Sequence, residues 1–313
     1  MTFISIKKLP KNFNLFLRNI IRNESYYFGK YINEFLPFLN PTAYKYLMEF
    51  PSIECFQDSY SKENPSLFMI VSSNDQDTRR EVLLLEYLKK DNLNELEVLI
   101  KELVLHWKDH QIQEIIFDIP IPIHLFLDRI LCPLSFRCIP RLIMVKELSK
   151  DDIAEVSEKN ISFVPAEEIP SAFRCLLSAY HHTHWKYLHP EVRNEYDGFK
   201  SLGNLISAHK ATEFPTAIQY KLNNECIGIL LGNCTGIQSS CLIHLAVHPS
   251  YRRQGIATQL LRTWYRLIQQ QNIKNIFLWT HVVNPALRLY LKEHFCPLHL
   301  YPAFYYNSQK DSL

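Results

Sequence analysis

The stretch LAVHPSYRRQGIATQLL, residues 245–261, decides the fold of this 313-residue chain. An apolar strand ends at a proline, two arginines and a glycine follow, and a helix with leucines at helical spacing begins. Such a loop turns backbone N–H groups inward, and the helix N-terminus adds unsatisfied donors and partial positive charge. Arg252, Arg253 and Gly255 complete an anion site that suits a pyrophosphate. A solvated basic turn is the alternative interpretation.

Glycine is scarce in the rest of the chain. The sequence has seven glycines, and six of them lie between residues 198 and 255. Neither a Walker loop nor a Rossmann G-x-G-x-x-G occurs in it. A nucleotide-like ligand is therefore expected near Gly255, the one glycine that a phosphate-binding backbone would need.

Composition excludes several classes of protein. With 47% hydrophobic and 21% charged residues, the chain is expected to fold into a packed core, and a net charge of +2 predicts no nucleic-acid partner. The apolar runs are no longer than a strand and the N-terminus lacks a continuous apolar segment, so we expect no membrane span, no cleavable signal peptide and a cytoplasmic location. The eight cysteines form no C-x-x-C pair. They are expected to be buried free thiols, with disulfides or a zinc site as alternatives.

The two halves of the sequence share one order of elements. In the second half we expect strands at 215–220, 226–232, 241–247, 276–279 and 298–305, and helices at 258–271 and from Pro285. In the first half we expect strands at 66–71, 81–88 and 115–119, and helices at 93–110 and 124–131. This order predicts an internal duplication with a period near 160 residues and two domains, 1–150 and 151–313.

The quoted stretch resembles motif A of the GNAT superfamily of N-acetyltransferases, V-x-P-x-[YF]-[RQ]-x-x-G-x-[GA]. The matching residues are Val247, Pro249, Tyr251, Arg252, Gly255 and Ala257. Downstream, Asn284-Pro285-Ala286 followed by Leu289-Tyr290 resembles the family segment N-P-A-x-x-L-Y. The Gly-Phe pair that usually follows is His294-Phe295 here, a departure at the end of a helix. The resemblance covers residues 160–307.

The resemblance implies an α+β (mixed α/β) fold of two GNAT-like domains. Each would be a mixed, mostly antiparallel sheet with a splayed cofactor cleft, flanked by helices. Acetyl-CoA, the acyl donor, would enter the cleft of the second domain. The residues expected to hold it are Leu245, Ala246 and Val247 along the pantetheine, Arg252, Arg253, Gln254, Gly255, Ile256 and Ala257 at the pyrophosphate, and Asn284. Asn284 is equally expected to cap the helix that follows it.

Two residues are candidates for catalysis. Tyr290 stands where the family commonly has a general-acid tyrosine, although it also fits as a packed aromatic. For the base, strict alternation places Cys241 and Ile243 on the face that the family uses, and neither is a good base. His244 has an imidazole suited to the role, and a bulge in the strand would change the alternation. A buried structural histidine is the alternative for His244.

The resemblance implies that the acceptor side is lined by the segment that follows the opening helix of the second half. Its candidate substrate-binding residues are His181, His182, His184 and Trp185. A solvated helix–loop segment is the alternative, and no metal is expected because no Cys or Asp ligand lies nearby.

The first half lacks the chemical parts of the second. The segment 89–94, which aligns with the anion site, has no glycine and carries Asp91, and the position of Tyr290 falls near Arg129. We therefore expect a degenerate GNAT-like first domain that binds no acetyl-CoA through this loop. One active and one silent copy is also similar to the VipF-type acetyltransferase effectors of intracellular bacterial pathogens.

The expected function is acetyl-CoA-dependent N-acetyl transfer to a primary amine of a small molecule or protein, by direct attack on the thioester. The resemblance to effectors adds a second location, the host cytosol reached without a cleavable signal peptide, and a host protein as partner. The alternative is a non-catalytic CoA-binding module that recruits a partner through its first domain.

Overall fold

The computed structural model describes residues 3–31, 41–49, 52–59, 64–74, 76–89, 93–119, 124–149, 152, 160–181, 189, 192, 198–199, 202–203 and 217–308. The strands are β1 (Phe3–Ile6), β2 (Ile53–Asp58), β3 (Leu67–Ser73), β4 (Arg79–Tyr87), β5 (Glu114–Phe117), β6 (Arg137–Glu147), β7 (Ile161–Phe163), β8 (Ala217–Leu222), β9 (Glu225–Cys234), β10 (Ser239–Val247), β11 (Asn275–His281) and β12 (Cys296–Asn307). The α-helices are α1 (Phe13–Phe28), α3 (Pro41–Leu47), α4 (Leu93–Asp109), α5 (His124–Leu131), α6 (Ile169–Tyr180), α8 (Ile256–Gln269) and α9 (Leu287–Lys292).

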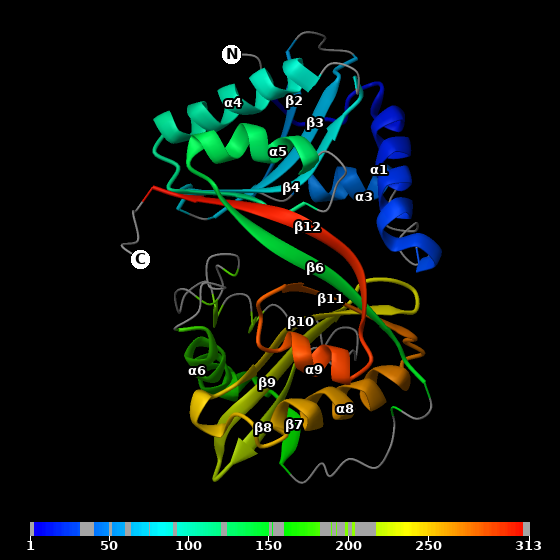
Figure 1. The fold of residues 1–313 in the computed structure, drawn as a ribbon, viewed down its shortest axis with the longest axis vertical. Coiled ribbons are helices and arrows are strands. Elements are labelled where there is room, and N and C mark those ends of the chain that lie inside the picture. Colours follow the sequence, from blue (N-terminus) through cyan, green and yellow to red (C-terminus); the bar gives the residue numbers. More distant parts are fainter. Residues whose placement is uncertain are drawn as a thin grey trace. The chain divides into compact units, whose positions relative to one another are not determined.

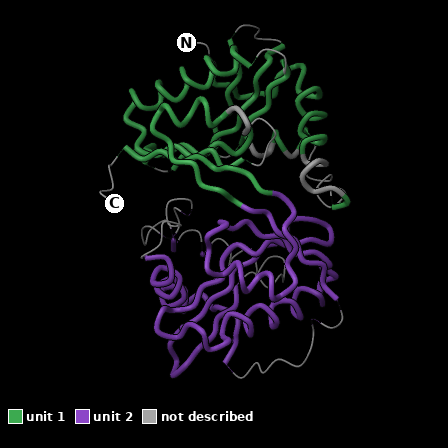
Figure 2. The backbone as a smooth tube through the Cα atoms, viewed as in Figure 1, with its two compact units in different colours: residues 1–141, 300–313 green, residues 142–299 purple. Residues whose placement is uncertain are grey.

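The chain forms two compact units (Figure 2). Unit 1 is residues 1–141 with 300–313, and unit 2 is residues 142–299. The division falls inside β6, and the chain returns to unit 1 inside β12, whose end pairs antiparallel with β5 from Phe304↔Phe117 to Asn307↔Glu114. An apolar strand pattern does not specify which sheet the strand joins, so the sequence alone placed the division at residue 150.

Unit 1 is a mostly antiparallel sheet between helices (Figure 1). Its strands lie in the order β1-β2-β3-β4-β5, and only β4 and β5 are parallel. Successive residues of β3 alternate between two cores: Met69 packs in the cluster that contains α4, and Phe68 in the cluster that contains α1. This period of two buries both faces of the sheet.

Unit 2 repeats this plan with the order β6-β11-β10-β9-β8-β7, in which β10 and β11 are the parallel pair. Helix α8 covers one face and α6 the other, each with its own buried cluster. The expected fold class, a mixed and mostly antiparallel sheet flanked by helices, is confirmed. The expected tight turn at Asn223 and Asn224 is also present, with φ of 51° and 64°.

The duplication is visible at single hydrogen bonds. The helix-to-strand junctions turn through left-handed residues, Gln111 at φ 60° in unit 1 and Asn272 at φ 59° in unit 2. Beyond them, Glu114 N–H donates to the carbonyl of Thr78, and Asn275 N–H donates to that of Gln238 in the same way. Equivalent residues are about 160 positions apart, as the sequence predicts.

The parallel pairing ends at equivalent points in the two units. In unit 2 the pairing of β10 with β11 ends at Leu242↔Leu278, and the register with β9 then shifts at Ile243. In unit 1 the pairing of β4 with β5 ends at Val82↔Phe117, and the register of β4 with β3 shifts next to it. Each shift leaves one extra residue, Ile243 in β10 and Leu83 in β4, which is a β-bulge. In unit 2, β11 continues to His281 without pairing with β10, so these two strands splay, whereas in unit 1 β5 ends where its pairing ends.

The glycines of β9 have a packing role that the sequence did not indicate. A Cβ on Gly232 would lie 2.1 Å from the ring of Trp264, and one on Gly228 would lie 2.8 Å from Ile256. Both neighbours belong to α8, and Trp264 is fully buried. Small residues in β9 thus allow α8 to lie close against the sheet.

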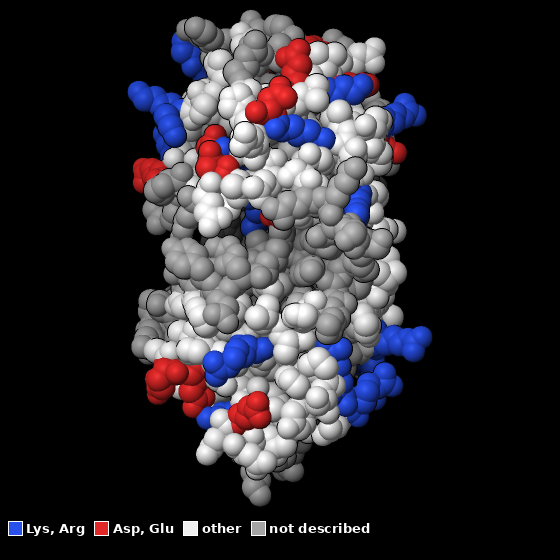
Figure 3. Space-filling model, turned by 90° about the vertical axis from the view of Figure 1, so that its left-hand side faces the viewer, with Lys and Arg blue, Asp and Glu red and all other residues white. Residues whose placement is uncertain are grey.

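The thiols differ from the expectation of burial. Cys55, Cys175 and Cys226 are buried, whereas Cys132, Cys138, Cys234 and Cys296 are exposed, so burial is a wrong prediction for these four. Burial raises the pKa of Cys55 to about 11. Among the described residues no helix is both long and apolar enough to cross a bilayer. On the face drawn in Figure 3, Lys and Arg side chains lie interspersed with Asp and Glu.

Candidate functional site

An anion cradle lies at the start of α8. We use this name for the backbone N–H groups of residues 253–258, none of which donates to another described residue. Gly255 precedes the helix at φ 81°, and nothing lies within 4 Å of the position that a Cβ would take. Arg253 is also left-handed, at φ 65°, which costs a residue with a side chain about 1 kcal/mol. Six consecutive N–H groups at a helix N-terminus, without partners among the described residues, have the geometry that an anion site would need, and the binding of an anion here stays a prediction.

The two arginines of this loop have different surroundings. Arg252 donates from Nε to the carbonyl of Val247 at 3.2 Å, and from its terminal nitrogen to the carbonyl of Ala179 at 3.0 Å. Both arginines are exposed, and the guanidinium of Arg253 forms no hydrogen bond or ion pair with a described residue. Arg252 joins the loop to strand β10 and helix α6, whereas Arg253 makes no such connection within the described part of the chain.

The splay exposes one edge of β10. Its other edge pairs with β9 through Leu245↔Leu230, Ala246↔Ile229 and Val247↔Gly228, whereas no described strand pairs with the open edge beyond Leu242. This edge ends at the loop that carries the anion cradle. An extended, amide-containing chain could therefore pair with β10 as an added strand while its anionic group reached the cradle.

The bulge changes which side chains share a face, so strict alternation is wrong for this strand. Leu245 packs in the cluster of α8, whereas Ile243 and Ala246 pack in the cluster of α6. His244, on the same side as α6, lies with its Nδ1 3.1 Å from the hydroxyl of Tyr180, the last residue of that helix. A bulge thus turns His244 toward the acceptor side that the resemblance implies.

His244 belongs to a compact cluster of rings. Its side chain is only 3% exposed, and the ring of His189 lies 5.0 Å away, centroid to centroid, in an edge-on arrangement. Tyr180 is 5.6 Å from each of the two histidine rings. Two imidazoles and a phenol thus meet beside β10, and all three groups can exchange protons.

Tyr290, the candidate acid, lies in α9 and is 6% exposed. It packs in the cluster of α8, with its ring 5.7 Å from that of Phe295. Burial raises its pKa well above the ordinary value near 10, so the phenol keeps its proton at any physiological pH. This residue is therefore both a packed aromatic and a protonated hydroxyl.

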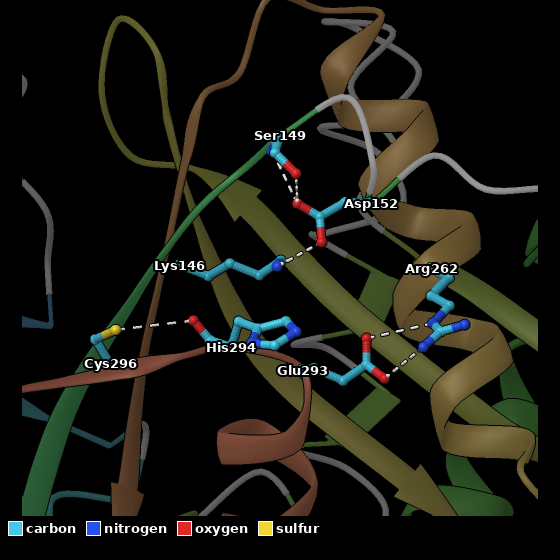
Figure 4. Close-up of polar contacts among 7 residues, drawn as sticks. All are labelled: Lys146, Ser149, Asp152, Arg262, Glu293, His294 and Cys296. Carbon is cyan, nitrogen blue, oxygen red and sulfur yellow. Dashed lines mark hydrogen bonds and ion pairs between the residues drawn. The ribbon is translucent and has the colours of Figure 1, made fainter.

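Polar contacts hold α9 in place (Figure 4). The buried carboxylate of Glu293, just beyond α9, accepts from Nε and a terminal nitrogen of Arg262 in α8 at 3.4 and 3.2 Å. His294 follows at φ 62°, where the family's glycine would be unstrained. In the same view Lys146 pairs with Asp152 at 2.6 Å.

Asn284 caps the turn before α9, as one of its two interpretations predicts. Its Oδ1 accepts from the N–H of Ala286 at 2.9 Å, and its Nδ2 donates to Oγ1 of Thr280 at 2.9 Å. A contact with the pantetheine amides stays a prediction.

The predicted acceptor residues are only partly described. His181 lies exposed in the turn after α6, and His182, His184 and Trp185 lie outside the described residues. Tyr180 and His189 were not predicted as site residues. The signal for Tyr180 was present, since it follows Phe173 and Leu176 at helical spacing on the buried face of α6. Nothing in the sequence near His189 indicates its place beside His244.

Unit 1 has different residues at the positions equivalent to His244 and Tyr290. The bulged strand β4 has Leu84 where β10 has His244. The N–H of Phe295 donates to the carbonyl of Tyr290, and that of Phe136 donates to Leu131 in the same way. Tyr290 therefore corresponds to the buried Leu131, two residues from the predicted Arg129. The link from strand to helix is also shorter in unit 1, residues 88–92 against 248–255.

Known proteins share this fold. Residues 217–297 match the family model described as an acetyltransferase (GNAT) domain. The fold is a tandem GNAT fold. A GCN5-related N-acetyltransferase from Sphaerobacter thermophilus is similar over 97% of this chain and 95% of its own, with 13% identity and a TM-score of 0.64. A tandem GNAT protein from the clavulanic acid biosynthesis pathway matches over 99% of both chains, with 10% identity and a TM-score of 0.58.

A GNAT-family acetyltransferase from Colwellia psychrerythraea is similar over 98% of this chain and all of its own, with 13% identity and a TM-score of 0.56. A search of curated proteins finds no matching sequence. At these identities the similarity concerns the fold, and this fold supports acyl transfer in general.

Proposed function

We propose that unit 2 transfers an acetyl group from acetyl-CoA to a primary amine. The observation that carries the proposal is the anion cradle at residues 253–258, which lies at the end of the edge of β10 with which no described strand pairs. One ligand would use both features of the site if its pyrophosphate lay on the cradle and its extended amide arm lay along Leu245, Ala246 and Val247. Acetyl-CoA has both groups and would supply the acetyl group as an activated thioester.

The side chains around the open edge suit a direct transfer. His244 would accept the proton that the amine loses as its nitrogen bonds to the acetyl carbon. In the tautomer whose Nδ1–H donates to the oxygen of Tyr180, the basic lone pair is on Nε2. Tyr290 would give a proton to the sulfur as the C–S bond breaks, and backbone N–H groups on the open edge of β10 would stabilise the oxyanion.

We assign no catalysis to the first domain. Leucines stand where unit 2 has His244 and Tyr290, and its shorter link at residues 88–92 contains no glycine. These substitutions remove the counterparts of the base, the acid and Gly255 together. The first domain would then serve packing, acceptor binding or the recruitment of a partner.

The similarity to VipF-type effectors extends the proposal to a protein delivered into a host cell. It rests on the plan of one active and one silent copy. The acceptor is then a small-molecule amine or an amine of a host protein, and both classes belong in the acceptor screen.

Thiol release from acetyl-CoA tests the proposal. The purified full chain is mixed with acetyl-CoA and a panel of small amines, polyamines, antibiotics and peptides, and thiol is measured against Tyr290→Phe. We expect acceptor-dependent release that the variant loses. If acetyl-CoA raises the melting temperature and no acceptor gives turnover, the protein is a non-catalytic CoA-binding module. If acetyl-CoA neither binds nor reacts, the assignment of the cradle is wrong as well.

A further inference from the structure

We infer that Arg252 is a positioning residue that ties the loop of the anion cradle to the Tyr180–His244 pair. As a claim about catalysis it rests on the function proposed above, whereas the contacts themselves do not depend on that function. Arg252 and Arg253 are adjacent, exposed and carry the same charge, but their contacts differ: Arg252 donates to two carbonyl groups, and Arg253 forms no hydrogen bond with a described residue.

The first contact fixes the loop to the end of strand β10. Arg252 follows a short turn, Pro249–Tyr251, and its Nε reaches back to the carbonyl of Val247, the last residue of β10. This bond closes the link between the strand and the cradle, so the direction in which residues 253–258 present their N–H groups depends on it.

The second contact fixes the loop to helix α6. The carbonyl of Ala179 is among the last four of α6, which have no partner within the helix, and a guanidinium there also interacts favourably with the helix dipole. The next residue, Tyr180, holds Nδ1 of His244 at 3.1 Å. One guanidinium therefore connects the end of β10, the end of α6 and the cradle.

The consequence is a coupling between the two halves of the site. A ligand on the cradle would hold the loop and, through Arg252, the last turn of α6 that carries Tyr180. His244 would then be aligned best when the cradle is filled. Arg253 makes no such connection within the described part of the chain, so it would act on the anion alone.

The ¹⁵N chemical shifts of the His244 imidazole nitrogens measure this coupling directly. We would record ¹⁵N NMR spectra of the full chain and of Arg252→Met, Arg253→Met, Arg252→Lys and Tyr180→Phe, with and without CoA. Tyr180→Phe shows the Nδ1 shift of His244 when the hydrogen bond is absent. Arg252→Met should move Nδ1 toward that value and Arg253→Met should leave it at the wild-type value. Arg252→Lys, which keeps the charge but cannot reach both carbonyl groups in a fork, should lie between them.

Spectra without CoA decide the positioning role even if the proposed function fails. A wild-type Nδ1 shift in folded Arg252→Met would overturn the inference. With CoA, we expect the His244 signals to move in wild type and in saturated Arg253→Met, and not in Arg252→Met. Equal movement in both arginine variants would also overturn the coupling. Absence of CoA binding to wild type would instead contradict the proposed function.

Discussion

The hydroxyl of Tyr180 lies 3.1 Å from Nδ1 of His244, although 64 residues separate the two in the chain. Helix α6 supplies the phenol, and the bulge in β10 supplies the turn that directs the imidazole toward it. The pair stands on one side of the open edge of β10, and the anion cradle lies at the end of that edge.

His244 is expected to act as the base, so its replacement should reduce kcat strongly. His244→Gln removes the basic nitrogen, and we expect kcat to fall by about 10²-fold or more with little change in the Kd of acetyl-CoA. Tyr180→Phe keeps the imidazole and should cost less. Steady-state kinetics on both variants, with isothermal titration for the Kd, measure this. Equal kcat in wild type and His244→Gln would make His244 a structural residue.

Tyr290 should keep its proton far into the alkaline range. Burial raises its pKa, so the protonated form that a general acid needs persists above the pH near 10 at which an exposed tyrosine loses it. The alkaline limb of the pH–kcat profile should therefore show no fall below about pH 10. A fall near pH 8 to 9 that Tyr290→Phe abolishes would contradict a buried acid. The same variant should lower kcat by about 10²-fold.

Gly232→Ala should destabilise the protein. The new Cβ would lie 2.1 Å from the buried ring of Trp264, and overpacking of a core costs about 1–3 kcal/mol. Gly203→Ala is the matched control, because nothing lies within 4 Å of its Cβ position and its φ is ordinary. Urea unfolding of both variants tests this. Equal midpoints for Gly232→Ala and wild type would show that α8 does not pack closely on β9.

His294→Gly should stabilise the protein by about 1 kcal/mol, because glycine occupies the left-handed region without strain. Ser135→Gly, at the equivalent position in unit 1 with φ 67°, should act in the same direction. Lys292→Gly, inside α9, should lower stability instead. Thermal unfolding ranks the three variants, and a loss of stability in His294→Gly would mean that its side chain contributes more than the strain costs.

The Lys146–Asp152 pair predicts an acid-dependent part of the stability. Burial opposes the charge of Asp152, but hydrogen bonds from Lys146 and Ser149 outweigh it and hold the pKa of this carboxyl below its usual range. A depressed pKa contributes stability that is present above the unfolded pKa, near 4, and is lost as the pH falls through the folded value. Asp152→Asn should therefore lower the free energy of unfolding at pH 7 and make it less sensitive to pH below 4. Denaturant titrations of wild type and Asp152→Asn at pH 7 and pH 3 measure this difference.

Local patterns in the sequence predicted most of the fold and part of the site. Hydrophobic periodicity located the helices and strands between residues 66 and 131 and between 215 and 305, although it missed β1, β2 and β7, and the residues around Gly255 indicated the loop of the cradle. Pairing over long distances was not predictable: nothing in β12 indicates that its end joins β5, and nothing in β10 specifies a bulge at Ile243. The contacts of His244 depend on that bulge, so its neighbours were identified only from the structure.

The most direct test of the account is the stoichiometry of CoA binding to the full chain, measured by isothermal titration calorimetry for wild type and Gly255→Glu. The account predicts one site per chain, because unit 2 has the cradle with its glycine at φ 81°, and the equivalent link of unit 1, residues 88–92, contains no glycine in its sequence. It also predicts that the glutamate abolishes binding by filling the open space with a negative charge. Two sites per chain, or binding that Gly255→Glu leaves unchanged in a folded protein, would contradict it.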